Sequence, residues 1–178
     1  MEIIQLKLNK EDIKIKGNQH AFTHCRSTVT ALASITQNWF NKTENSCDGR
    51  MGIHALFTDF SKAFDLVDHG LLLRKLANMN VSKCFWLWVR SFSEGRSQQV
   101  KLDCTLSSIR PCPSGVPQGS VISPTLFNIH VDDLEDCIPD FLDINPYKYA
   151  DDCTQDEAIP YGSGSNMQRV LDAMSDWA

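Results

Sequence analysis

Residues 148–154 read KYADDCT, with two acidic residues next to aromatic, strand-forming neighbours. This pattern predicts a β-hairpin whose turn carries Asp151 and Asp152. Residues 53–60, IHALFTDF, are a short apolar run that includes Asp59, and such a run predicts a short, largely buried strand. The sequence therefore predicts strands beside these acidic residues, and the fold class depends on the helices and loops predicted between the strands.

Apolar residues at helical spacing predict helices on both sides of these strands. The predicted helices cover 27–40, 69–79, 82–92, a segment from Ser123 through Leu134, and the stretch that begins at Met167. Ser123 and Pro124 suit a helix start, because serine offers a capping oxygen and proline fits the first turn. The expected apolar positions of the first and third helices are Ala31, Leu32, Ile35, Trp39, Phe85, Trp88 and Val89.

Other segments have the composition of connections. Residues 97–109 alternate enough to predict a hairpin, and residues 41–51, 111–120 and 160–166 are predicted loops. Residues 1–18 are lysine-rich and predict a helix fragment followed by a connector. Strands separated by helices indicate an α/β or α+β domain.

Composition excludes several classes of protein. The chain has 178 residues, 42% apolar and 22% charged, which fits one globular domain or a piece of a larger one. Nine glycines and seven prolines are too few for a disordered or collagen-like chain. No apolar run approaches the ~18–20 residues of a membrane span, and the N-terminus lacks the apolar region of a signal peptide.

Charge is unevenly distributed along the chain. The overall charge of −5 divides into +4 over residues 1–100 and −9 over residues 101–178. This can mean a metal-holding region beside a phosphate-facing one, or simply two solvated surfaces. The seven cysteines form no C-x-x-C pair, which favours free thiols in a reducing compartment. His20, His24 and Cys25 form a weak candidate zinc site without a second ligand cluster.

Asp59, Asp151 and Asp152 are the candidate metal ligands. An aspartate at the end of a buried strand is costly to ionise unless a cation compensates its charge. Mg²⁺ prefers such hard oxygen ligands together with substrate phosphates, and two ions ~4 Å apart can promote an in-line phosphoryl transfer. The alternative is that Asp151 and Asp152 are turn residues and that Asp59 caps a strand. A second pair, Asp132-Asp133, falls on a predicted helix, where a run of acids is typical of a solvated face.

Three motifs in order give the sequence a family resemblance. FTDFSKAFDLVDH (57–69), GVPQGSVISPTLFN (115–128) and YADD (149–152) together resemble the core motifs of reverse transcriptases of non-LTR, LINE-like retrotransposons. QHAFTHCRSTVTAL (19–32) resembles the fingers segment QHGFRxGRST, and WVRSFSEGRSQQV and MQRVLDAMSDWA also match. The resemblance covers about residues 18–178. The group II intron and retron types are the runner-up within the class.

The resemblance implies an α/β (α+β) polymerase palm, an antiparallel sheet backed by helices. It implies a partial fingers segment at residues 1–50 and a palm at 51–178 that is truncated after the catalytic hairpin, without a thumb. The implied reaction is two-metal nucleotidyl transfer from a dNTP to a primer 3′-hydroxyl, directed by an RNA template and a DNA primer. Two Mg²⁺ ions are the implied cofactors, with Mn²⁺ as a substitute. The remainder of the polymerase and a retroelement polyprotein are implied partners, no membrane is expected, and the location would be the nucleus or cytoplasm.

The resemblance also implies a role for individual residues. Asp59, Asp151 and Asp152 would be the catalytic carboxylates and metal ligands, and Phe60 would offer its backbone carbonyl to a metal. Four residues would contact the nucleotide: Phe64, Gln118, Gly119 and Arg26. Phe64 would exclude a ribose 2′-hydroxyl, and Gly119 would let the backbone approach a ligand. The alternatives are a core phenylalanine, an ordinary loop amide and a surface arginine.

The fingers segment departs from the family pattern. Ala21, Thr23 and Cys25 stand where the family has Gly, Arg and Gly. The lost arginine removes a contact that is worth about 1–3 kcal/mol when charge-assisted. The altered fingers segment keeps an inert or recruited retroelement remnant open as a second function. A metal-dependent phosphohydrolase that uses the same acids is a third, but it would leave PQGSVISP (117–124) without a purpose.

Overall fold

The computed structural model describes residues 15–44, 51–139 and 141–178. The chain divides into two compact units. The described part of the first is Lys62–His130, and the second consists of Ile15–Ser61 and Val131–Ala178. The predicted helix fragment at the N-terminus lies mostly outside the described residues.

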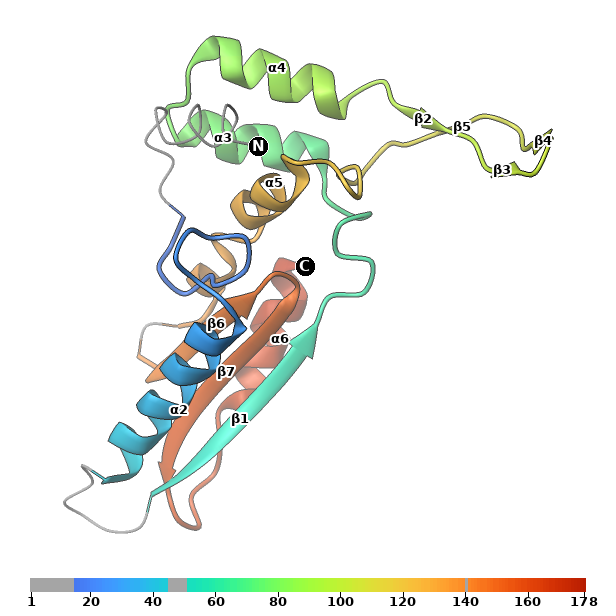
Figure 1. Ribbon diagram of the computed structural model, residues 1–178. Helices are drawn as coiled ribbons and strands as arrows, with labels where there is room; N and C mark the ends of the chain where they lie inside the picture. The colour runs from blue at the N-terminus through green and yellow to red at the C-terminus, as the bar shows by residue number, and fades with distance from the viewer. Residues whose placement is uncertain (1–14, 45–50, 140) are drawn as a thin grey trace. The chain divides into compact units, whose positions relative to one another are not determined.

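The second unit is built on a three-stranded antiparallel sheet. The strands are β1 (Met51–Asp59), β6 (Ile144–Tyr149) and β7 (Asp152–Pro160), and β7 lies in the middle (Figure 1). β1 pairs with β7 along its whole length, and β6 joins β7 through the short turn at residues 150–151. The predicted KYADDCT hairpin and the predicted strand at 53–60 are therefore neighbours in one sheet. The prediction that this strand is largely buried was wrong, because β1 lies at the edge of the sheet, none of its residues is buried, and Phe57 is 69% exposed.

Two helices cover opposite faces of this sheet (Figure 1): α2 (Thr28–Glu44) and α6 (Met167–Trp177). Beside α6 lies the short 3-10 helix η1 (Leu134–Cys137). The apolar core on the α6 side consists of Leu134, Ile138, Ile144, Cys153, Val170 and Met174. α2 contributes buried Ala31 and Ile35, whereas Leu32, which we expected on its apolar side, is 62% exposed.

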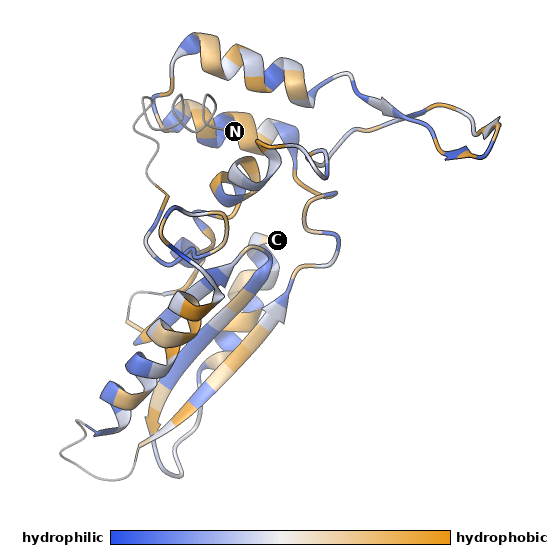
Figure 2. Cartoon of the chain, viewed as in Figure 1, coloured by the Kyte–Doolittle hydropathy of each residue, from blue (hydrophilic) through white to orange (hydrophobic). Residues whose placement is uncertain are grey.

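The middle of β7 is hydrophilic although it is buried. Gln155, Asp156 and Glu157 follow one another there and form the hydrophilic stretch visible in Figure 2. Asp156 lies on the α2 side, where it accepts hydrogen bonds from Trp39 Nε1 (3.0 Å) and Lys42 Nζ (3.2 Å). Side chains alternate along a strand, so Asp152 and Asp156 share one face while Cys153 contributes to the core on the other.

The described part of the first unit contains three helices, α3 (His69–Asn78), α4 (Lys83–Ser93) and α5 (Ser123–His130). α3 and α4 follow the prediction closely, because Asp68 and Ser82 cap them by accepting from Leu71 N (2.5 Å) and Phe85 N (3.3 Å). The predicted hairpin is confirmed as two nested pairs. They are β2 (Ser97–Gln98) with β5 (Arg110–Pro111) and β3 (Lys101–Leu102) with β4 (Thr105–Leu106).

Some boundaries and faces differ from the prediction. α2 continues to Glu44, so residues 41–44 are helical rather than loop, and β1 already begins at Met51. On α4, Phe85 and Val89 are buried as expected, but Trp88 is 45% exposed. α5 begins at Ser123, but the Ser123 hydroxyl donates to the Pro117 carbonyl (2.7 Å) and does not cap the helix.

The predicted helix from Ser123 through Leu134 was too long, because α5 ends at His130. The backbone after it meets a buried lysine, Lys148, which is 1% exposed. Lys148 Nζ donates to the carbonyls of Val131 (3.1 Å) and Asp132 (3.2 Å). A buried ammonium needs such acceptors, and these carbonyls are the ones that a continued helix would use internally.

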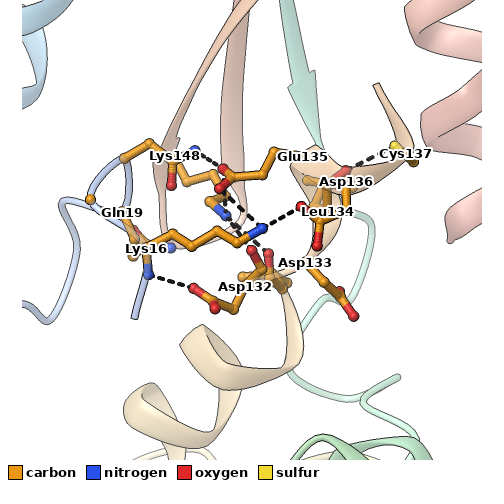
Figure 3. A network of polar contacts seen from close by, with 12 residues as sticks. Lys16, Gln19, Asp132, Asp133, Leu134, Glu135, Asp136, Cys137 and Lys148 are labelled. Carbon is orange, nitrogen blue, oxygen red and sulfur yellow. Dashed lines mark hydrogen bonds and ion pairs between the residues drawn. The ribbon is translucent and has the colours of Figure 1, made fainter. Parts of the chain in front are cut away.

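The prediction that Asp132-Asp133 lies on a solvated face was also wrong. Asp132 is buried and accepts from the Lys16 backbone N–H (2.7 Å), and Asp133 accepts from Trp177 Nε1 (3.2 Å). Figure 3 shows the resulting polar network, in which Glu135 pairs with Lys16 (3.3 Å) and with Lys148 (3.4 Å). These acids hold the segment that begins at Ile15 against the sheet.

Candidate active site

The three candidate catalytic acids gather at one end of the sheet in the second unit. Asp59 is the last residue of β1 and lies directly opposite Asp152, the first residue of β7. Directly opposed residues of an antiparallel pair project from the same face, with Cβ atoms about 4.5–5.5 Å apart. Asp151 precedes Asp152 in the turn. Asp59 and Asp152, which are 93 positions apart in the sequence (152 − 59), are therefore neighbours in the sheet.

These acids suit a hard cation by their chemistry. Asp59 and Asp152 are exposed and Asp151 is half-buried, so all three carboxylates are accessible from solvent. Carboxylate oxygens are the ligands that Mg²⁺ prefers. Within residues 15–44, 51–139 and 141–178, however, no three His, Cys, Asp or Glu side chains already form a cluster that could hold a metal ion. The strand register makes Asp59 and Asp152 neighbours, but the three carboxylates do not form a metal-binding cluster in the described structure.

Residues next to these acids belong to the core. The Phe60 ring lies 6.1 Å from the Trp177 ring at a tilt of 58°, and it packs at the edge of the core around α6. Burial raises the pKa of the Cys153 thiol to about 12, and this thiol packs in the apolar core on the α6 side of the sheet.

The turn that carries Asp151 has an unusual backbone. Ala150 adopts a φ of 58°, in the left-handed region that costs an L-residue roughly 1–2 kcal/mol. Its N–H donates to the side-chain oxygen Oε1 of Gln19 (3.1 Å), a residue that is 1% exposed. Sequence reasoning did not single out Gln19, although it opens the QHAF motif.

Arg26 is engaged with the backbone beside Gln19. Its Nη1 donates to the carbonyls of Gly17 and Gln19, the latter at 2.9 Å. Arg26 therefore holds the segment 17–19 in place. His20 lies nearby with Nδ1 3.0 Å from Thr30 Oγ1, and burial together with the Arg26 charge lowers its pKa.

The candidate zinc site is not assembled. His24 Nδ1 lies 2.9 Å from Cys25 Sγ, but His20 Nδ1 is hydrogen-bonded to Thr30 Oγ1. The described residues contain no cluster of three metal-binding side chains.

The candidate nucleotide-contacting residues Phe64, Gln118 and Gly119 lie in the first unit. The Phe64 ring stacks on Phe127 with centroids 4.4 Å apart and an angle of 16°. Gln118 is exposed, and its Nε2 lies 3.4 Å from Asp65 Oδ1. Gly119 has a φ of +79° with open space around the position of a side chain, which fits a backbone that a ligand can approach.

A glycine fixes the loop that carries Gln118. Gly115 has a φ of +84°, and a Cβ placed there would meet the Asp65 carbonyl oxygen at 2.6 Å. Its N–H donates to Val67 O (2.8 Å), and its carbonyl accepts from His69 Nε2 (2.7 Å). The motifs FSKAFDLVDH and GVPQGS are therefore bound directly to each other, backbone to backbone.

No helix in the described part of the chain is long and apolar enough to cross a membrane.

Comparison with known proteins identifies similar sequences. A profile of the family described as reverse transcriptase (RNA-dependent DNA polymerase) matches residues 1–178. An RNA-directed DNA polymerase from the mobile element jockey of Drosophila melanogaster is 38% identical over 129 residues, 68% of this chain and 14% of that protein. A probable RNA-directed DNA polymerase from the transposon BS of the same organism is 28% identical over 174 residues, 92% of this chain and 18% of that protein. The chain thus spans less than a fifth of these relatives.

The fold also resembles a solved structure. The apo telomerase of Candida tropicalis, truncated from its C-terminal domain, superposes with a TM-score of 0.68. The match covers 98% of this chain and 36% of the telomerase chain at 16% identity, so the likeness concerns the fold. It supports the predicted α/β (α+β) palm architecture, and the jockey, BS and related matches confirm the resemblance to non-LTR elements.

Proposed function

Because this chain belongs to the reverse transcriptase (RNA-dependent DNA polymerase) family, we propose that it forms the catalytic palm of an RNA-directed DNA polymerase. The observation that supports this most strongly is the register of β1 and β7, which sets Asp59 opposite Asp152 with Asp151 in the adjoining turn. The reaction would extend a DNA primer by one deoxynucleotide at a time along an RNA template. We further propose that residues 1–50 belong to the fingers and residues 51–178 to the palm.

Members of the family use divalent metals, and the three aspartates are the residues that would hold them here. Two bound Mg²⁺ ions, or Mn²⁺ in their place, would supply charge stabilisation at the primer 3′-hydroxyl and at the leaving pyrophosphate. The aspartates would contribute negatively charged oxygen ligands at the solvent-facing end of the sheet, and the Phe60 carbonyl would add another oxygen. Gln118, Gly119 and Phe64 would contact the incoming dNTP.

We propose only a limited role for Arg26 in nucleotide binding. A fingers arginine would contact phosphate, but Arg26 Nη1 already donates to the Gly17 and Gln19 carbonyls. A phosphate contact would have to use its other donors, of which a guanidinium has five in all. The template, the primer, the remainder of the polymerase and a polyprotein context are proposed partners on the strength of the family.

Primer extension tests the proposed function. The chain, completed with the thumb of a related reverse transcriptase, is given an RNA template, a DNA primer and dNTPs with Mg²⁺, and the products are resolved by length. We expect extension by the unaltered protein and none by Asp151→Asn or Asp152→Asn. The matched control is Asp176→Asn, an exposed aspartate of α6, which should extend normally. Extension that survives loss of both Asp151 and Asp152 contradicts the proposal.

A second candidate, an inert or recruited palm remnant, draws on the altered fingers segment. Ala21 and Thr23 replace a glycine and an arginine of the family pattern, and Ala21 is buried at 1% exposure. A remnant predicts no cation binding that depends on Asp59 and Asp151. Calorimetric titration of the chain with Mn²⁺ separates the two, because a working palm must bind Mn²⁺ more weakly after Asp59→Asn.

A further inference from the structure

The turn that carries Asp151 is held by a contact whose catalytic meaning rests on the proposed function. The hairpin between β6 and β7 places this turn at the end of the sheet, and Ala150 within it is buried and holds a left-handed backbone conformation. A strained turn keeps one shape only where surrounding contacts enforce it. Gln19 contacts this turn from outside the hairpin.

We propose that Gln19 is a positioning residue that fixes the orientation of the catalytic turn. Its Oε1 accepts two backbone N–H groups at once, from Ala150 (3.1 Å) and from Ala21 (2.9 Å). The first hydrogen bond fixes the turn at Ala150, one residue before Asp151. The second locks the Gln19 side chain in the conformation that reaches the turn.

The backbone of Gln19 is itself fixed to the sheet. Residues 18–20 form a parallel bridge to β6, in which Lys148 N donates to Asn18 O and His20 N donates to Lys148 O, both at 2.9 Å. Arg26 Nη1 donates to the Gln19 carbonyl from the other side. The backbone around Gln19 is thus hydrogen-bonded to β6 on one side and to Arg26 on the other, and the side chain reaches the turn from this fixed position.

The network in Figure 3 secures this segment further. Lys16 donates through its backbone to Asp132 and pairs with Glu135, which also pairs with the buried Lys148. Lys148 is the β6 residue that the Gln19 segment bridges. A series of contacts therefore connects Lys16 with Ala150, the residue before Asp151. All of these contacts lie within the second unit.

The chemistry of the side chain makes a sharp test possible. Gln19 Nε2 is buried and has no hydrogen-bond partner among the described residues, so the contact depends on the oxygen alone. Gln19→Glu keeps an oxygen at that position and should keep the contact. Gln19→Met keeps the length and unbranched shape but removes the acceptor. Gln155→Met is the matched control, because Gln155 is equally buried in β7 and its Oε1 has no partner in the described structure.

The first measurement is hydrogen exchange at the Ala150 amide, followed by NMR on the chain. In the unaltered chain this amide should be protected, and Gln19→Met should speed its exchange by about fivefold or more, the effect of one lost hydrogen bond. Gln19→Glu and Gln155→Met should leave the Ala150 rate within about twofold of the original. Free exchange at Ala150 in the unaltered chain overturns the proposal even if the variants fail to fold.

The second measurement is Mn²⁺ affinity by calorimetry, together with kcat and KM for dNTP in primer extension. Loss of a residue that orients metal ligands typically costs about tenfold or more in metal affinity or activity. Gln19→Met should show this in Mn²⁺ affinity and in kcat, with KM for dNTP little changed, and Gln19→Glu should restore both. Faster Ala150 exchange with unchanged Mn²⁺ affinity and kcat contradicts the positioning role.

Failure of this inference differs from failure of the proposed function. If Asp151→Asn leaves Mn²⁺ binding and extension intact, the polymerase assignment falls, and with it the catalytic meaning of the turn. If Asp151→Asn abolishes both while Gln19→Met changes nothing, the assignment stands and Gln19 has only a structural role.

Discussion

Asp59 and Asp152 face each other across β1 and β7, as the terminal pair of a nine-residue antiparallel ladder. Like charges directly opposite on a sheet destabilise it by up to about 1 kcal/mol. The chain therefore places two carboxylates where they repel each other, unless a cation lies between them. Stability and metal binding should be linked at this pair.

The first prediction follows from that repulsion. Asp59→Asn should leave the metal-free chain as stable as the original or slightly more so, because it removes one of the opposed charges. Mg²⁺ should raise the melting temperature of the unaltered chain, and this increment should shrink in Asp59→Asn. Thermal unfolding at several Mg²⁺ concentrations measures it. Asp176→Asn, an exposed aspartate of α6, should keep the full increment. If Mg²⁺ raises the melting temperature of Asp59→Asn as much as that of Asp176→Asn, Asp59 and Asp152 do not share a metal ion.

The second prediction concerns the buried carboxylate between α2 and the sheet. Asp156 is 0% exposed and accepts from Asn38 (3.0 Å), Trp39 and Lys42. Asp156→Ala leaves the Lys42 ammonium without this partner, and such a loss typically costs about 3–5 kcal/mol. Urea unfolding should show a large fall. Asp143→Ala removes the exposed partner of the same lysine, and it should change the free energy of unfolding by well under about 1 kcal/mol.

The third prediction is a pH dependence at the start of α6. Burial alone would raise the pKa of Glu157, but hydrogen bonds from Asn166 and Ser165 outweigh it and hold the pKa below its ordinary value. A carboxyl group with a lowered pKa stabilises the fold above its unfolded pKa and loses that contribution as the pH falls through the folded value. Stability should therefore fall as the pH is lowered from about 6 to about 3.

Asn166→Ala tests the cause of that effect. The variant removes the hydrogen bond from Asn166 Nδ2 to Glu157 Oε1 (2.6 Å), so the pKa of Glu157 should move back up. The loss of stability between neutral and acidic pH should then be smaller than in the unaltered chain. A pH profile of equal steepness in Asn166→Ala assigns the acid sensitivity to other carboxylates. Glu94→Gln, at an exposed pair with Arg90, should leave the profile unchanged.

The fourth prediction concerns sugar selection. If Phe64 excludes the ribose 2′-hydroxyl, Phe64→Val should raise incorporation of rNTP relative to dNTP in primer extension. Phe64 also stacks on Phe127, so the same variant should lower the stability of the first unit. Phe127→Leu weakens that stack from the other side and serves as the control. If both variants lower stability but neither changes the rNTP to dNTP ratio, Phe64 is only a core residue.

The sequence predicted the elements of the site because each signal was local. Aromatic neighbours and two central acids predicted the β6–β7 hairpin, and an apolar run predicted β1. The structure pairs the two, so that Asp59 lies opposite Asp152. Loop composition predicted 111–120, and the backbone contact of Gly115 with Val67 explains why that loop accompanies residues 64–69. The family resemblance was carried by the same local motifs.

What the sequence did not predict depends on distant partners. α5 ends early because Lys148 claims the carbonyls that follow it, and Asp132 is buried because the backbone of Lys16 donates to it. The role of Gln19 depends on Ala150, which lies 131 positions away in the sequence. Periodicity reports a buried or exposed face, but it does not say which distant residue satisfies a buried polar group.

The most direct test of whether Asp59, Asp151 and Asp152 share a bound metal uses Fe²⁺ in place of Mg²⁺. Fe²⁺ bound to the chain, with ascorbate and peroxide, generates radicals that cut the backbone close to the metal, and mass spectrometry locates the cuts. We expect paired cuts around Asp59 and around Asp151, suppressed by excess Mg²⁺ and absent in Asp59→Asn. Cuts confined to one of these segments, or centred on residues 132–136, would show that the acids do not share a metal.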